Sequence, residues 1–126
     1  TSSANLSNYF LGKMAYENSD FINSSLHLNE FLKHSNDDVL VCGAIKLLTE
    51  ISLKNNNPEE ALRNLDKATN YKFSNSLMFD LELMKVATFL IMNNFKSGKV
   101  ILEEIDNQKD LPSHIKQRLE ELYGMI

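Results

Sequence analysis

Three stretches of the chain align with one another without a gap, at a constant spacing of 37 residues. They are NSDFINSSLHLNEF (residues 18–31), NNNPEEALRNLDKA (residues 55–68) and MNNFKSGKVILEEI (residues 92–105). Self-similarity at a fixed period of this size is the sequence mark of stacked structural repeats. It constrains the fold strongly, because a structure assigned to one stretch must also suit the other two.

The matched positions carry three kinds of residue. A turn residue is the third residue of each stretch, a small side chain follows four positions later, and a leucine follows four positions after that. Small side chains let two helices approach closely, and the leucine fills the groove beside them. The pattern therefore predicts helical hairpins, with Gly98 close to Val86 and Leu90. The matched residues are Asp20, Asn57 and Asn94, then Ser24, Ala61 and Gly98, then Leu28, Leu65 and Leu102.

Apolar residues recur at helical spacing along almost the whole chain, and strand alternation is nowhere sustained. Clusters of Asn, Ser and Asp interrupt this pattern and divide the chain into about seven helices. We predict an all-α fold: a right-handed solenoid of three helical hairpins with a 37-residue period, plus a C-terminal capping helix. Residues 1–126 are expected to form a single domain, with units at about 5–34, 37–70 and 75–106 and a terminal helix at 111–123.

Composition excludes several classes of protein. Hydrophobic residues make up 43% of the chain and charged residues 24%, which is typical of a folded globular protein. The net charge of -4 and the absence of a basic cluster argue against nucleic-acid binding. Cys42 is the only cysteine, so no disulfide framework or thiolate metal site is expected. The start TSSANLSNYF lacks a methionine, so we expect either that the start was processed away or that the chain is a piece of a longer protein.

Candidate catalytic and metal-binding groups are few. His27, Glu30 and His34 can share one helix face, which is a possible spacing for metal ligands. That face is the solvated one in a repeat of this type, so we expect no metal. No glycine-rich phosphate loop or nucleophile motif occurs in the sequence. We therefore expect a protein that is not an enzyme, with no catalytic residues and no cofactor.

The segment NPEEALRNLDKA resembles the second helix of a tetratricopeptide-type repeat, and Leu11-Gly12 followed by Phe21 resembles the first helix and turn of that family. The resemblance covers about residues 5–106, although the period is 37 rather than 34 residues and there is no Trp. The chain also resembles, more distantly, the soluble part of a single-anchor bacterial protein related to the ancillary subunit of the secretion translocon. That second resemblance implies a parent protein tethered to the inner membrane, with this domain in the periplasm or the cytoplasm.

Stacked hairpins of this family line a concave face with their first helices. The resemblance thus implies a protein-interaction scaffold that binds a partner peptide or helix on that face. An alternative interpretation of Leu83, Leu90 and Ile91 is that they are core residues covered by the last helix. The column Tyr16, Leu53 and Leu90 occupies equivalent places in the three units. The residues predicted to bind the partner are Tyr9, Lys13, Tyr16, Lys46, Glu50, Leu53, Leu83 and Leu90.

A competing hypothesis is a structural domain that self-associates to position other parts of its parent protein. The first helix is apolar on two sides, through Leu6, Phe10 and Met14 on one and Tyr9 and Tyr16 on the other. We expect a preceding helix or a second copy, as in a homodimer, to cover this end. At the other end, the terminal helix carries an apolar stripe of Ile115, Leu119 and Leu122 opposite polar residues, which suits a cap.

Overall fold

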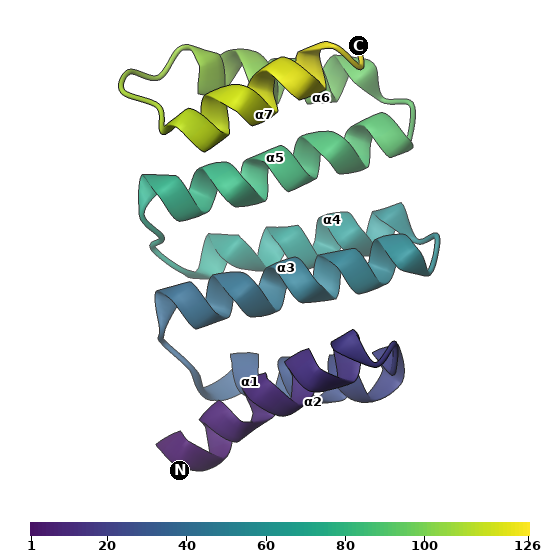
Figure 1. The fold of residues 1–126 in the computed structure, drawn as a ribbon, viewed down its shortest axis with the longest axis vertical. Coiled ribbons are helices and arrows are strands. Elements are labelled where there is room, and N and C mark those ends of the chain that lie inside the picture. Colours follow the sequence, from purple (N-terminus) through teal and green to yellow (C-terminus); the bar gives the residue numbers. More distant parts are fainter. The chain divides into compact units, whose positions relative to one another are not determined.

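The protein is all-α, as the sequence predicts, and its computed structural model describes residues 1–126 (Figure 1). Seven α-helices and one short 3-10 helix account for the regular structure, and no strand is present. The helix boundaries fall at the predicted Asn, Ser and Asp clusters. The elements are α1 (Ser2–Glu17), α2 (Phe21–His34), α3 (Asp38–Lys54), α4 (Pro58–Asp66), η1 (Lys67–Asn70), α5 (Asn75–Ile91), α6 (Phe95–Asp106) and α7 (Ser113–Tyr123).

Capping side chains explain where the second helix of each hairpin begins. Asp20, Asn57 and Asn94 are the N-cap residues of α2, α4 and α6, and each side chain accepts a hydrogen bond from the backbone N–H three residues later. An N-cap of this kind satisfies one of the donors that a helix start leaves unpaired. The three turn residues that the alignment identifies therefore have one common role.

The turns that precede these caps also share one backbone conformation. Ser19, Asn56 and Asn93 have φ angles of 58°, 57° and 59°. Each cap residue donates its N–H to a carbonyl five residues earlier, and the residue before it donates to a carbonyl three residues earlier. This is the Schellman arrangement that commonly ends a helix. The five-residue bonds are those from Asp20 to Ala15, Asn57 to Ser52 and Asn94 to Phe89.

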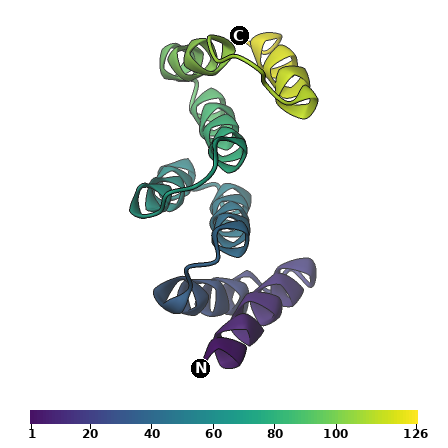
Figure 2. The same ribbon diagram turned by 90° about the vertical axis from the view of Figure 1, so that its left-hand side faces the viewer.

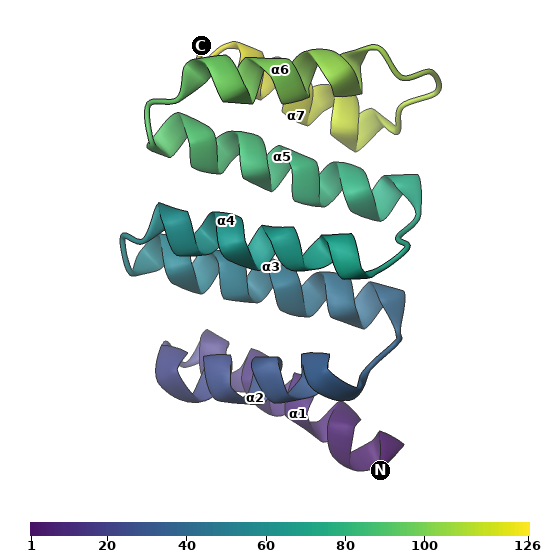
Figure 3. The same cartoon turned by 180° about the vertical axis from the view of Figure 1, so that it is seen from behind.

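The helices form two compact units, residues 1–72 and residues 73–126, where the sequence favours a single domain. In the first unit α1 packs against α2, α3 packs against α4, and α3 also contacts α1 and α2. Figure 2 shows α1 beside α2, and Figure 3 shows α2 in front of α1 and α4 in front of α3. In the second unit α5 packs against both α6 and α7.

Close packing in the first unit is clearest where α1 meets α2. Gly12 is buried, and a Cβ atom placed on it would lie 2.7 Å from Cγ of Leu28. Ser24 donates a hydrogen bond from Oγ to the carbonyl oxygen of Gly12 across 2.7 Å. Gly12 thus leaves the room that the Leu28 side chain fills, and Ser24 can lie against the α1 backbone because its hydroxyl has a partner there.

The core of the second unit is formed by α5, α6 and α7. The apolar stripe of α7 is buried and its polar residues Lys116, Gln117, Glu120 and Glu121 are exposed, as its amphipathic sequence pattern predicts. Burial of such a stripe is the main source of stability for a short helix. The buried members of this core are Leu83, Val86, Leu102, Ile105, Leu111, Ile115, Leu119 and Leu122.

Gly98 lies in α6 next to the residues expected from the sequence. A Cβ atom on Gly98 would lie 3.5 Å from Leu90 and 3.6 Å from Val86. These are ordinary contact distances, so the predicted neighbours are confirmed. The predicted reason for the glycine is wrong, because the neighbouring helix leaves room for a methyl group.

Candidate functional site

The predicted binding face of the first unit lies along α1 and α3, which are neighbours in that unit. The hydroxyl of Tyr16 donates a hydrogen bond to Oε2 of Glu50 across 2.6 Å. Burial raises the pKa of Tyr16 to about 12, and the hydrogen bond to Glu50 and its negative charge act in the same direction. Two predicted site residues are therefore bonded to each other, and the bond joins the two helices.

The other predicted residues of this face differ in exposure. Lys13 is exposed, whereas Lys46 and Leu53 are half-buried. Lys54, which follows Leu53, is also exposed. Along α1 and α3 this face therefore carries three lysines and one partly covered leucine.

Tyr9 is buried rather than available to a partner, so its assignment to the binding face is wrong. Its ring lies 5.3 Å from that of Phe31 and 5.4 Å from that of Phe10, between ring centroids. A Cβ atom on Gly43 of α3 would lie 2.8 Å from the Tyr9 hydroxyl oxygen. Tyr9 is buried because Gly43 has no side chain and leaves space for the phenol.

Leu83 is also buried, in the core of the second unit, so the alternative interpretation holds for this residue. Leu90 is half-buried and packs against the same core, while Ile91 is exposed. The equivalent residues Tyr16, Leu53 and Leu90 are all half-buried. Exposure alone therefore does not separate binding from packing at these three positions.

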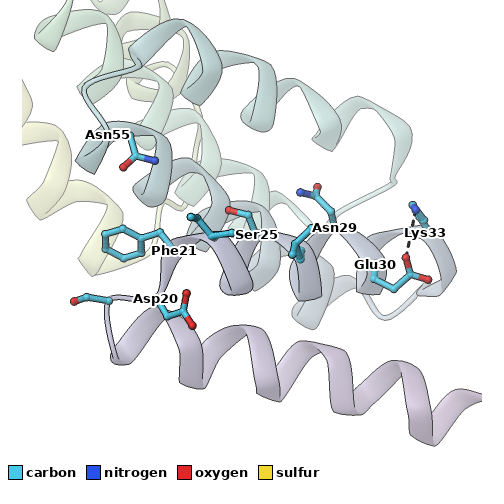
Figure 4. A pocket seen from close by; sticks show the side chains of 10 residues that line it. Asp20, Phe21, Ser25, Asn29, Glu30, Lys33 and Asn55 are labelled. Atoms are coloured by element: carbon cyan, nitrogen blue, oxygen red, sulfur yellow. Dashed lines mark hydrogen bonds and ion pairs between the residues drawn. The ribbon is translucent and has the colours of Figure 1, made fainter.

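A groove on the outer side of α2 is a feature that the sequence analysis missed. It has a volume of about 690 Å³ and lies between α2 and the turn after α3, where Asn55 is found (Figure 4). Phe21, Ile22 and Leu26 provide its apolar surface. The available sequence signal was Ile22 and Leu26, two large apolar residues on the side of α2 that faces away from α1.

Some of the polar side chains that line this groove bond to neighbouring side chains. Lys33 donates to Oε2 of Glu30 across 3.3 Å, and Nζ of Lys67 donates to Oδ1 of Asn29 across 3.0 Å. Burial lowers the pKa of Lys67, and the nearby charge of Glu60 opposes that shift. The groove thus combines three apolar side chains with polar ones, of which Asn29, Glu30 and Lys33 have bonded partners.

The three residues at metal-ligand spacing on α2 bind neighbouring side chains instead. His27 shares a hydrogen bond with Oδ1 of Asn8 across 3.1 Å, and Nε2 of His34 lies 3.4 Å from Oε1 of Glu30. No group of three or more His, Cys, Asp or Glu side chains is arranged to hold a metal ion. None of the helices has the length and apolar character needed to span a bilayer.

A pair of carboxylates faces a small hollow in the second unit. Glu82 of α5 and Glu104 of α6 line this hollow, whose volume is about 220 Å³, together with Phe79. Burial raises the pKa of Glu82, Glu104 raises it further, and Lys85 acts in the opposite direction. Protonation of Glu82 is therefore favoured by folding.

Comparisons of the chain with protein-family models, with curated proteins and with solved structures found no match.

Proposed function

We propose that the chain is a tetratricopeptide-like repeat scaffold, arranged as a right-handed solenoid of three helical hairpins and a capping helix. The support for the repeat is the recurrence of one turn, with its positive φ angle and its capping side chain, at residues 19–20, 56–57 and 93–94. Repeats of this kind bind partners through surfaces that extend over successive units. The scaffold has no catalytic role.

The proposed activity is binding of a peptide or helix of another protein on the face of α1 and α3. One observation carries this proposal: the bond between Tyr16 and Glu50 holds the two helices together beside Leu53. A binding face fixed before the partner arrives loses less conformational entropy on association. The exposed Lys13 and Lys54 would contact polar or acidic groups of the partner, and Leu53 would contact an apolar side chain.

Site-specific photo-crosslinking in the intact parent protein, in its own cells, tests this face. A photoreactive amino acid is placed at Lys54, and the control position is Arg63, an exposed residue of α4. We expect one discrete adduct from position 54 and none from position 63. Equal labelling from both positions, or no adduct from position 54, would refute the proposed face.

The second candidate function is self-association that positions other parts of the parent protein. The observation that favours it is the set of exposed apolar side chains on the outer side of α1, among them Leu6 and Phe10. Large exposed apolar patches commonly mark association surfaces. Light scattering over a range of protein concentrations distinguishes the two, because a tight dimer supports self-association and a monomer at all concentrations supports partner binding.

A further inference from the structure

The outer face of α1 exposes apolar residues at positions where the equivalent residues of α3 are buried. Leu11 and Met14 are 46% and 57% exposed, whereas Leu48 and Ile51, 37 residues later in each case, are 3% and 4% exposed. In the first unit α3 packs on α1 and α2. The apolar face of α1 therefore resembles the face of α3 that is buried by its neighbouring helices.

The contact between α1 and α3 shows how such a covering helix is held. Tyr9 lies over Gly43, where a Cβ atom would be 2.8 Å from its hydroxyl oxygen. Seven residues further along both helices, the hydroxyl of Tyr16 bonds to Glu50. Each contact pairs a side chain of α1 with the residue of α3 that accommodates it: a large ring over a glycine, and a donor on a carboxylate.

The same two places on α1 have different residues. Leu6 stands where α3 has Gly43, and Lys13 stands where α3 has Glu50. Both Leu6 and Lys13 are exposed. A helix that packs on α1 as α1 packs on α3 must therefore present a small side chain to Leu6. Seven residues later a carboxylate is the residue that pairs best with Lys13, because a hydrogen bond between an ammonium group and a carboxylate is stronger than one to a neutral acceptor.

We propose that the outer face of α1 is the docking site of one additional amphipathic helix, with a small residue and an acidic residue seven positions apart facing Leu6 and Lys13. Phe10, half exposed between them, supplies the central apolar contact. This site shares Lys13 with the face of α1 and α3 assigned to partner binding above, whereas Leu6 and Phe10 belong to this site alone. It depends on the 37-residue register.

Charge complementarity favours such a helix over a second copy of the chain. In a two-fold pair of α1 helices centred on Phe10, Lys13 of one copy would face Ser7 of the other, because both lie three residues from the centre. No carboxylate would then meet Lys13. Isologous interfaces place the same patch on both subunits, so Lys13 would have no carboxylate partner in either copy.

A fluorescent peptide tests the proposal directly. The probe is residues 1–18 of this chain with Tyr9→Ala and Tyr16→Glu, which supply the small and acidic residues, and with Phe10→Gln and Met14→Gln, which remove its own outward apolar side chains. A hydrocarbon staple on the outward side keeps it helical. Fluorescence anisotropy then measures its binding to the full chain of residues 1–126 and to variants of it.

We expect saturable binding that Phe10→Glu or Lys13→Glu in the protein weakens at least tenfold. Ile22→Glu, which changes an exposed apolar residue of α2, should leave binding unchanged. A probe with Tyr16→Lys in place of Tyr16→Glu should recover affinity for the Lys13→Glu protein. Thermal melts monitored by circular dichroism check that the protein variants fold. If one of them does not fold, the protein variant Met14→Gln is measured in its place.

Three results would overturn the proposal. The first is the absence of saturable binding to the unaltered chain. The second is equal binding to the Phe10→Glu protein, which would place the probe elsewhere. The third is a dimer, detected by sedimentation, that Phe10→Glu converts to a monomer, because a second copy would then occupy the face.

Discussion

The hydroxyl of Tyr16 in α1 lies 2.6 Å from Oε2 of Glu50 in α3 and donates a hydrogen bond to it. Both side chains are half-buried, so neither is fully solvated if the other is removed. A hydrogen bond to a charged acceptor is stronger than one between neutral groups, and a partner left behind without it is destabilised by incomplete solvation. This bond is therefore a structural connection between two helices that are far apart in sequence.

Tyr16→Phe should lower the free energy of unfolding by about 1 kcal/mol, the net value of a typical intramolecular hydrogen bond. The raised pKa of Tyr16, about 12, lies above the value near 10 expected in the unfolded chain. The stability linked to this proton is thus present below about pH 10 and is lost as the pH rises through 12. Urea denaturation of Tyr16→Phe and of the control Glu17→Gln, an exposed acid of α1, measures the effect. Equal stability of Tyr16→Phe and the parent would show that the bond contributes nothing.

Alanine at two buried glycines should have opposite effects. Gly98→Ala should stabilise the protein by up to about 1 kcal/mol, because alanine is the better helix former and its methyl group fits at 3.5 Å from Leu90. Gly12→Ala should destabilise it by about 1–3 kcal/mol, because the same methyl group would be 2.7 Å from Leu28. Chemical denaturation compares the two variants. Gly98→Leu, which is too large for the space, should cost about 1–3 kcal/mol and serves as the overpacking control.

Leu53→Glu separates a binding role from a packing role. If Leu53 contacts a partner, the variant should lose the crosslinked adduct at position 54 while its thermal midpoint changes little, since a half-exposed site loses little burial. Leu48→Glu changes a buried position of the same helix. It should lower the thermal midpoint strongly, because it buries an unpaired carboxylate. If the two variants melt alike, Leu53 is a core residue and the proposed face is incorrect.

Ser19→Gly should raise stability by about 0.5–1 kcal/mol. Ser19 has a φ of 58°, a conformation that is unfavourable for residues with a Cβ atom and free of that penalty for glycine. The greater entropy of glycine in the unfolded chain reduces the gain. The neighbouring Asn18, with a φ of -91°, provides the control, because Asn18→Gly has no such strain to relieve and should not stabilise. Thermal denaturation of both variants decides the matter, and a lower midpoint for Ser19→Gly would contradict the prediction.

Glu82→Gln should raise the thermal midpoint at pH 7. Burial, together with the charge of Glu104, raises the pKa of Glu82 in the folded protein, so its ionisation opposes folding. The stability linked to its protonation is complete below the usual glutamate value of about 4.3 and is lost as the pH rises through the higher folded value. The advantage of Glu82→Gln should therefore disappear near pH 4. An advantage of the same size at both pH values would exclude the charge as its cause.

The helices were predictable because their signals are local. Asp20, Asn57 and Asn94 cap helices from within a few residues of sequence, and the apolar stripe of α7 is complete within that one helix. Burial of individual site residues was not predictable, because it depends on a partner distant in sequence. Tyr9 is buried because Phe31 of α2 and Gly43 of α3 lie next to it.

The groove on α2 was missed for a related reason. Its apolar residues Ile22 and Leu26 are within one helix, but the hollow forms only where that helix lies beside the turn at Asn55. Helical periodicity describes one face of one helix at a time. It contains no information on which turn of another hairpin closes a groove.

The recurrence of one turn at residues 19, 56 and 93 has a consequence for how the chain can be cut and rejoined. The cap residues that follow these turns have φ and ψ angles of -89° and 76°, -122° and 74°, and -94° and 69°. Removing residues 20–56 would therefore join Ser19 to Asn57 with nearly the backbone path that now leads from Ser19 to Asp20. Each turn is therefore a suitable splice point for deleting, duplicating or exchanging a unit with only a small change in the backbone angles of the turn.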